Sequence, residues 1–215
     1  MGNQIYSIGR EFGSGGKEIG ELLAQKLGIK LYDKELLQHA AKESGFCEEI
    51  FENHDEKPTS SFLYSLVMDT YSGGGYSSAP FLDMPLNHKV FLAQFDTIKK
   101  IAERESCVIV GRCADYALSS NPDCLNIFIH AEMEDRIKWI AERLGLSENK
   151  AKDVIQKKDK QRASYYNYYT CKKWGDARSY DLTLNTSKLK PEDCVEIILN
   201  YRQKMQKNAG SPSKG

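Results

Sequence analysis

The chain has 215 residues, and its 30 Lys and Arg balance 30 Asp and Glu. This length allows one buried core with a small accessory subdomain, so we expect a single domain over residues 1–215. A net charge of zero gives no overall attraction to nucleic acid or membrane surfaces, and no apolar run reaches the roughly 18 residues of a membrane span. The six cysteines form no CxxC pair. We interpret the cysteines as free thiols of a reducing cytoplasm. A predicted strand begins within the first few residues of the chain, so we expect no signal peptide.

The most informative stretch is a glycine-rich turn at residues 9–20, with the sequence GREFGSGGKEIG. A short β-type run precedes it and a helical pattern follows it. Glycines let the backbone turn tightly, so several N–H groups can point at one anion, and the helix N-terminus adds partial positive charge. We interpret the stretch as a phosphate cradle made by Gly13, Ser14, Gly15, Gly16 and Lys17, with Arg10 as a second source of charge.

This cradle departs from the standard phosphate loop, G-x-x-x-x-G-K-[ST]. Glu11 stands where the first glycine belongs, and Glu18 stands where the hydroxyl residue belongs. A glycine turn that only joins a strand to a helix is therefore the alternative. Glu18 also has two interpretations. It is either a direct or water-mediated Mg²⁺ ligand, or a first-turn acid that only complements the helix dipole.

Strand and helix patterns alternate along the rest of the chain. Residues 28–33 predict a second strand that ends at Asp33, and residues 34–43 predict a helix. Further strands are predicted at residues 107–110, 125–129 and 181–185. Further helices are predicted at residues 88–105 and 133–143, from about 148 to at least 162, and from Pro191 onward. The alternation predicts an α/β fold, a five-stranded parallel sheet with helices on both faces.

Three segments do not fit this alternation. Residues 52–86 are polar and then rich in Gly and Ser, which is typical of a functional insert. A fixed arm that packs on this chain, or on a second copy in a homo-oligomer, is the alternative for this segment. Residues 157–179 combine basic and aromatic side chains, and the tail at residues 208–215 is expected to be disordered.

The arginine that follows the predicted strand at residues 107–110 is a second candidate site residue. Arg112 lies at the strand's C-terminal end, on the edge of the sheet where the glycine turn also lies. A guanidinium suits phosphate because its planar fork gives two parallel hydrogen bonds. The alternative is a surface arginine in an ion pair with Asp115 or Glu132.

The basic and aromatic run at residues 157–179 also has two functional interpretations. A mobile lid would close over a polyphosphate, with cations that neutralise charge during transfer. The other is a groove in which Tyr and Trp stack the bases of single-stranded RNA. The zero net charge and the phosphate cradle favour the lid and small-molecule nucleotides over nucleic acid.

Taken together, these motifs resemble those of the cytidylate kinase-like family, a branch of the P-loop nucleoside monophosphate kinases. The resemblance covers nearly the whole chain and rests on residues 7–16, 31–36, 111–112, 165–166, 173–176, 180–182 and 184–187. It implies a P-loop kinase fold with a mobile acceptor-binding insert and a lid. It also implies transfer of the ATP γ-phosphoryl group to a nucleotide such as CMP, with ATP and Mg²⁺ as cofactors.

The resemblance also implies roles for individual residues. Arg112 matches an arginine that holds the acceptor phosphate, with Asp33 and Asp159 as further substrate-binding residues. Arg136 resembles an arginine that stands at the beginning of the lid region and touches ATP. Lys17, Arg112, Lys158 and Arg162 are the catalytic candidates. Four positions depart from the pattern, because Gly16 falls on the loop lysine of this family, Glu18 on its threonine, Arg162 on an aspartate and Tyr165 on an arginine.

Overall fold

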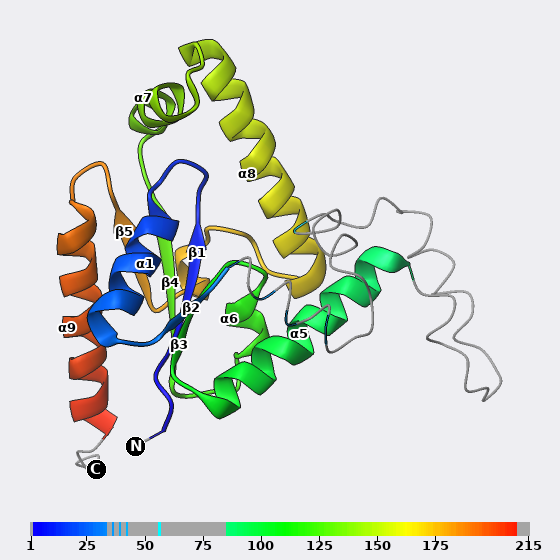
Figure 1. The fold of residues 1–215 in the computed structure, drawn as a ribbon, viewed down its shortest axis with the longest axis vertical. Helices are drawn as coiled ribbons and strands as arrows, with labels where there is room; N and C mark the ends of the chain where they lie inside the picture. The colour runs from blue at the N-terminus through cyan, green and yellow to red at the C-terminus, as the bar shows by residue number, and fades with distance from the viewer. Residues whose placement is uncertain are drawn as a thin grey trace.

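The computed structural model describes residues 2–33, 36, 39, 42, 56 and 85–209, and Figure 1 draws the other residues as a thin grey trace. The described chain forms a five-stranded parallel sheet with the strand order β2-β3-β1-β4-β5. This confirms the predicted α/β fold class. The strands are β1 (Ile5–Arg10), β2 (Lys30–Tyr32), β3 (Cys107–Val110), β4 (Cys124–His130) and β5 (Leu182–Asn185).

Helices cover both faces of this sheet (Figure 1). Helices α1 (Gly16–Leu27) and α9 (Pro191–Ala209) pack on one face, whereas α5 (Leu86–Arg104) and the short α6 (Ala114–Ala117) pack on the other. Helices α7 (Met133–Leu144) and α8 (Glu148–Thr170) pack on each other beyond the carboxyl edge of the sheet, where Figure 1 shows α7 nearly end-on and α8 lengthwise. A 3₁₀ turn, η1 (Ala177–Ser179), leads from α8 back to β5.

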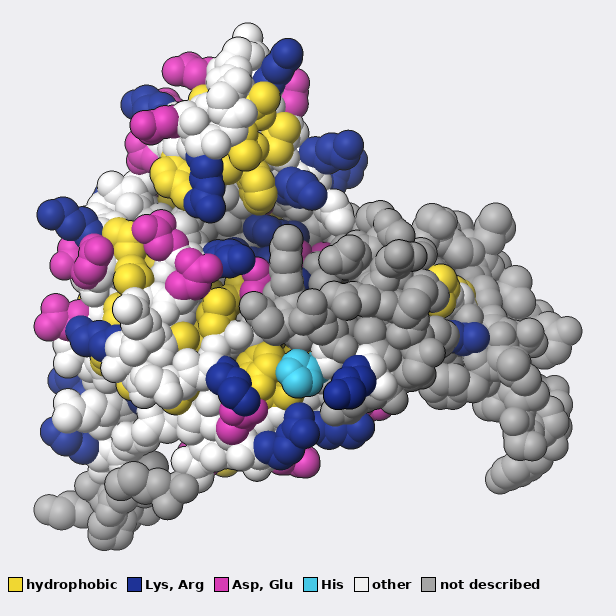
Figure 2. Space-filling model, viewed as in Figure 1, with side chains coloured by type: hydrophobic (Ala, Val, Ile, Leu, Met, Phe, Trp, Pro, Cys, Tyr) yellow, Lys and Arg dark blue, Asp and Glu magenta, His cyan; other side chains and the backbone are white. Residues whose placement is uncertain are grey.

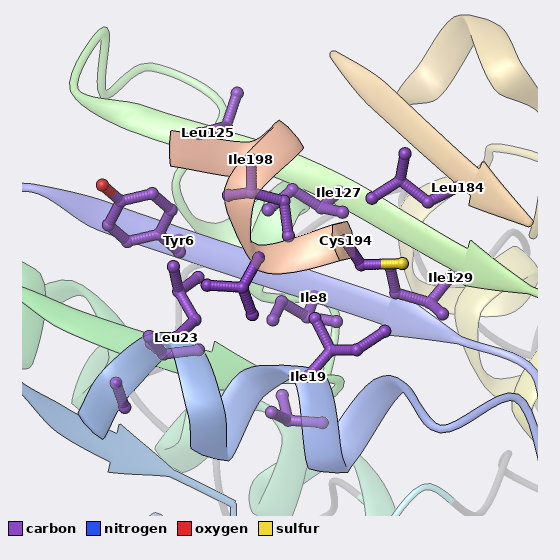
Figure 3. Packing of buried hydrophobic residues seen from close by; sticks show 14 residues of the cluster. Tyr6, Ile8, Ile19, Leu23, Leu125, Ile127, Ile129, Leu184, Cys194 and Ile198 are labelled. Atoms are coloured by element: carbon purple, nitrogen blue, oxygen red, sulfur yellow. The ribbon is translucent and has the colours of Figure 1, made fainter. Parts of the chain in front are cut away.

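The central strands are apolar without alternation because both of their faces are buried. In β3, Val108 and Val110 face the core under α1 and α9, whereas Cys107 and Ile109 face the core under α5 and α6. Figure 3 shows the first of these cores, where Ile19 and Leu23 of α1 and Ile198 of α9 meet the central strands. The buried side chains of the two cores fix the carboxyl ends of β1 and β3 side by side.

The connections from β1 and β3 leave the sheet on opposite faces. Strand β1 continues into α1 on one face, and β3 continues into α6 on the other. In an open α/β sheet, a crevice forms where neighbouring connections diverge in this way, outside the carboxyl ends of the strands. Arg10 ends β1 and Arg112 follows β3, so both arginines lie at this crevice.

Several predicted segments lie wholly or partly outside the described residues. Leu36, His39 and Lys42 are helical, in agreement with the helix predicted at residues 34–43. Of the predicted insert at 52–86, the structure describes Glu56 and the last two residues, so the role of this segment stays a prediction. Helix α8 runs well past residue 162, and α9 includes the first two residues of the segment 208–215. No helix in the described part of the chain is long and apolar enough to cross a membrane.

Candidate active site

The glycine turn forms a loop between β1 and α1 that is held in place from below. Gly13 and Gly15 have φ angles of 84° and 74°, in the left-handed region that side chains disfavour. The buried Ser14 hydroxyl lies 2.9 Å from the Glu11 carbonyl oxygen and 3.1 Å from that of Ile129. The Ser14 hydroxyl is therefore used to anchor the loop to β4 rather than exposed to a ligand.

The upper side of the loop opens onto a large cavity. Gly15 is the N-cap residue of α1 and has no side chain that could accept hydrogen bonds from the first turn. The backbone N–H groups of that turn therefore face the cavity. The cavity has a volume of about 820 Å³ and is lined by the loop, the first turn of α1 and one face of α7. Figure 2 shows basic and acidic side chains along the hollow below α7 and α8. These features fit a bound polyphosphate, because the loop offers backbone donors and the helix dipole favours an anion.

Arg10 fills the space that a side chain at position 16 would need. A Cβ atom added to Gly16 would lie 2.5 Å from Cβ of Arg10 and 3.3 Å from Cβ of Ile129. A lysine at position 16 is therefore incompatible with this placement of Arg10. The geometry explains the missing loop lysine, since an arginine from the preceding strand lies where that lysine would begin.

Arg10 and Arg162 converge on one carboxylate. Nη1 of Arg10 lies 2.9 Å from Oε1 of Glu56, and Nε of Arg162 lies 3.3 Å from Oε2 of the same side chain. The backbone N–H of Arg112 donates a third hydrogen bond to Oε1, at 3.3 Å. Burial alone would raise the pKa of Glu56, but the three guanidinium groups outweigh it and hold this pKa well below its ordinary value.

Arg162 also fixes the beginning of the loop. Its Nη1 donates to the Arg10 carbonyl at 3.2 Å, and its guanidinium lies 5.5 Å from the centre of the Phe12 ring. Burial, together with the nearby charge of Arg10, lowers the pKa of Arg162 to about 10. Arg162 therefore stays charged at neutral pH, and α8 delivers a buried positive charge to the carboxyl end of β1.

Asp33 joins two of the predicted basic residues. Its Oδ1 accepts a hydrogen bond from Arg112 at 2.8 Å, and its Oδ2 lies 3.1 Å from Nζ of Lys17. Burial would raise the pKa of Asp33, but Arg112 and Lys17 together lower it. The alternative from the sequence was an ion pair of Arg112 with Asp115 or Glu132, whereas the structure pairs Arg112 with Asp33. The Asp115 carboxylate instead accepts a hydrogen bond from the Tyr166 hydroxyl at 2.6 Å.

Asp159 ties helix α8 to the glycine loop between β1 and α1. Its Oδ1 accepts from the Phe12 backbone N–H at 2.7 Å, and its Oδ2 lies 2.5 Å from Nη1 of Arg136. Buried Arg136 also lies 3.5 Å from Glu11 and donates to the Phe12 carbonyl at 3.3 Å. This network holds α7, α8 and the loop together on one side of the cavity.

The remaining candidates lie at the rim of the site. Lys17 and Glu18 are exposed on the first turn of α1 and line the cavity. Lys158 is exposed on α8 and takes part in none of the ion pairs given above. Among the described residues, no group of three or more His, Cys, Asp or Glu is placed to hold a metal ion. A single carboxylate at Glu18 fits a Mg²⁺ ion that takes its other ligands from phosphates and water.

Two acidic residues of the site were not among the sequence candidates. Glu56 lies in a polar stretch before Pro58, and nothing in that stretch distinguishes it from its acidic neighbours. Glu11 was noted only as a departure from the loop motif, yet it accepts from the Ala131 N–H at 3.2 Å and faces Arg136. Their roles arise from contacts between distant segments, which local sequence patterns do not reveal.

The aromatic residues of the basic run are mainly part of the core. Tyr165, Tyr166 and Tyr169 are buried, and the Tyr169 ring stacks on Phe91 of α5 with a centroid distance of 3.9 Å. Trp174 packs edge to face on a ring of β4, and Tyr168 is 42% exposed. Three of the five rings are thus unavailable for stacking on bases, which removes the main support for a single-stranded RNA groove.

Comparison with known proteins defines the class first. The fold is similar to a gluconokinase from Sinorhizobium meliloti, with a TM-score of 0.53 and 13% identity over 96% of this chain and 95% of that one. It is also similar to the shikimate kinase from Acinetobacter baumannii in complex with shikimate, with a TM-score of 0.51 and 14% identity over 98% and 97%. At this identity the likeness concerns the fold alone, so the chain has a P-loop kinase fold.

The sequence then identifies the family. The profile of the cytidylate kinase-like family matches residues 5–188, so the chain belongs to that family. A cytidylate kinase from Sulfolobus acidocaldarius is 30% identical over 118 residues, which are 54% of this chain and 62% of that protein. A crystal structure of an uncharacterized protein from Eubacterium ventriosum has a TM-score of 0.70 and 32% identity, over 94% of this chain and 99% of that one.

Proposed function

We propose that this chain is an ATP-dependent nucleoside monophosphate kinase that transfers the γ-phosphoryl group to CMP or another small phosphate acceptor. One observation carries the proposal. Arg10, Arg162 and the Arg112 backbone N–H, from three distant segments, meet beside an uncapped glycine loop at the carboxyl edge of the sheet. Phosphoryl transfer needs such a cluster, because its catalysis rests on positioning and charge stabilisation.

The glycine loop is the donor side of the proposed site. The ATP phosphates would lie along the N–H groups of Gly13, Gly15 and Gly16, facing the cavity of about 820 Å³. Arg10 would take the part of the loop lysine, since its side chain occupies the space beside Gly16. Asp159 and Arg136 would keep the loop in shape from the α8 side.

The acceptor side is assigned to the crevice between β1 and β3. The acceptor phosphate would lie against the Arg112 backbone N–H, between the side chains of Arg10 and Arg162. Asp33 would orient Arg112 and Lys17 through the two ion pairs that it forms. Each arginine then offers charge to the oxygens of the transferred group, and removing one such arginine typically costs several powers of ten in rate.

Magnesium is the metal that this proposal requires. When bound, Mg²⁺ neutralises negative charge on the nucleotide phosphates. Glu18 would hold it directly or through water, as the acidic residue on the first turn of α1 that lines the cavity. Glu18→Gln is expected to raise the Mg²⁺ concentration needed for tight ATP binding. An unchanged Mg²⁺ dependence would instead assign Glu18 to the helix dipole alone.

We also propose that residues 157–179 act as a lid and residues 52–86 as the acceptor-binding insert. Closure would exclude water from the acceptor site, since otherwise ATP is hydrolysed. Asp159 and Arg162 support this proposal, because both lie on α8 and contact the phosphate loop. Hydrogen exchange with and without a non-hydrolysable ATP analogue plus CMP tests it. Protection should rise in both segments together, and unchanged protection would rule out the lid.

A coupled assay with ATP, Mg²⁺ and a panel of nucleotide acceptors tests the kinase proposal. CMP and dCMP come first, because a curated relative is named a cytidylate kinase. ADP should form only when a suitable acceptor is present. No turnover with any acceptor would refute the kinase. A rise in melting temperature with ATP but no turnover would favour a non-catalytic nucleotide-binding module, which the missing lysine and hydroxyl of the loop suggest as the second candidate.

A further inference from the structure

We propose that Glu56 is an internal occupant of the phosphate site, and that a ligand phosphate must displace its carboxylate. The inference rests on the proposed function, because it concerns the same arginine cluster. It adds that the Glu56 carboxylate occupies the arginine cluster before a ligand binds. The class of ligand that displaces it is a phosphate monoester or a terminal phosphoryl group.

The contacts of Glu56 are those expected of a bound anion. Its two carboxylate oxygens take hydrogen bonds from Arg10 at 2.9 Å, Arg162 at 3.3 Å and the Arg112 backbone N–H at 3.3 Å. These donors come from the ends of β1 and β3 and from α8, the three segments that meet at the switch point of the sheet. Charge-assisted donors of this kind also recognise phosphate, with the guanidinium fork as the usual partner.

The site has no room for both anions. The space enclosed beside Glu56, between β1, the Gly111 turn and α8, has a volume of only about 20 Å³. That volume holds about one water molecule, so a phosphate group does not fit beside the carboxylate. A Cβ atom added to Gly111 would lie 2.5 Å from Oε1 of Glu56, so the turn at Gly111 is shaped closely around the carboxylate. Phosphate and Glu56 are therefore mutually exclusive occupants.

Glu56 is held in this place under backbone strain. Its φ angle of 47° lies in the left-handed region, which a side chain disfavours. Strained residues persist only when surrounding contacts overdetermine them, and here the contacts are the three donors and the Gln161 side chain, which donates to the Glu56 carbonyl at 3.3 Å. Loss of the carboxylate contacts to an incoming phosphate would release this strain, which favours exchange over a permanent structural ion pair.

The exchange would protect the donor nucleotide. With Glu56 in place, its carboxylate holds the guanidinium donors of Arg10 and Arg162, so these arginines are not available to assist an attacking water. Arrival of the acceptor phosphate would turn both guanidinium groups from Glu56 to the reacting phosphates. Binding of the correct acceptor would thus complete the catalytic cluster, as in other enzymes that use induced fit.

Equilibrium binding of inorganic phosphate, CMP and ATP to the full chain tests the proposal, by calorimetry at fixed ionic strength. Glu56→Gln removes the competing charge at nearly constant size. It should tighten phosphate binding by about tenfold or more, which is the lower end of what one charged hydrogen bond contributes. Glu196→Gln, on the exposed face of α9, is the matched control and should leave binding unchanged. Glu56→Asp keeps the charge but has a shorter side chain that reaches the arginines less well, so it should also tighten phosphate binding. This variant replaces Glu56→Gln in the test if Glu56→Gln does not fold.

The outcomes separate this inference from the proposed function. Equal or weaker phosphate binding in both Glu56 variants would overturn the displacement and make Glu56 a structural ion pair, while the kinase proposal would stand. Absence of binding by all three ligands, in every variant, would overturn the phosphate site itself. Tighter binding of CMP but not ATP would assign the displacement to the acceptor phosphate, and the reverse would assign it to the donor. Either pattern supports the exchange.

Discussion

Gly111→Ala is the substitution that tests the packing of the arginine cluster most selectively. Gly111 has a φ angle of 80°, and an added Cβ would overlap Nη1 of Arg10 and lie 2.5 Å from Oε1 of Glu56. Two costs should add. The left-handed backbone costs an alanine about 1–2 kcal/mol. Displacing the Arg10–Glu56 pair costs about 1.5–3 kcal/mol, because a hydrogen bond between charged groups is lost. The expected loss in the free energy of unfolding is about 2.5–5 kcal/mol.

Gly28→Ala separates the two costs. Gly28 ends α1 with a φ angle of 65°, and an added Cβ would meet nothing within 4 Å, so only the backbone cost of about 1–2 kcal/mol applies. Urea unfolding of both variants and the wild type measures the difference. Gly111→Ala should be the less stable variant by about 1.5–3 kcal/mol and should bind phosphate more weakly, whereas Gly28→Ala should bind it normally. Equal destabilisation of the two variants would refute the close packing of Arg10 and Glu56 around Gly111.

Three further substitutions test other parts of the network. Asp159→Asn should weaken ATP binding by about tenfold in calorimetry, because the phosphate loop loses a charged acceptor; Asp153→Asn, exposed on the same helix, should not, and equal effects would contradict the anchoring role. Tyr166→Phe should lower the free energy of unfolding by about 1–3 kcal/mol, since the buried Asp115 carboxylate loses its donor; Tyr168→Phe, at a 42% exposed site, is the control. Asp115→Asn tests pH dependence. Burial raises the pKa of Asp115, so its contribution to stability is full below pH 3.8 and is lost as pH rises through its folded pKa. The variant does not titrate there, so its stability relative to the wild type should increase from pH 4 to pH 7 in urea unfolding, and a constant difference would contradict this.

The fold was predictable because its signals are local. The apolar run at residues 107–110 predicts a buried parallel strand, and both faces of that strand are in fact covered. The Gly28 C-cap and Pro191 at the first position of a helix mark two boundaries that the structure reproduces. The short helix α6 was not predicted, since four residues carry too little periodicity to be recognised.

The candidate site was only partly predictable. The strand-end positions of Arg10 and Arg112 follow from parallel-sheet topology, which the sequence pattern reveals. The partners of these residues do not follow from it. Glu56 meets Arg10 across 46 positions, and Asp159 meets Phe12 across 147, so only the folded chain brings them together. The basic and aromatic run illustrates the same limit, because its tyrosines have the composition of a stacking platform yet pack against α5.

The most direct test of the central claim follows the phosphoryl group itself. Phosphorus NMR of the wild type with ATP, Mg²⁺ and CMP distinguishes a nucleoside diphosphate formed from the acceptor from free inorganic phosphate. Signals of CDP should appear at the rate at which ATP is lost. Arg162→Gln should slow that transfer by about 1,000-fold or more, since it removes a buried charge from the proposed transfer site. Inorganic phosphate without any acceptor diphosphate, across the whole nucleotide panel, would contradict phosphoryl transfer as the function of this site.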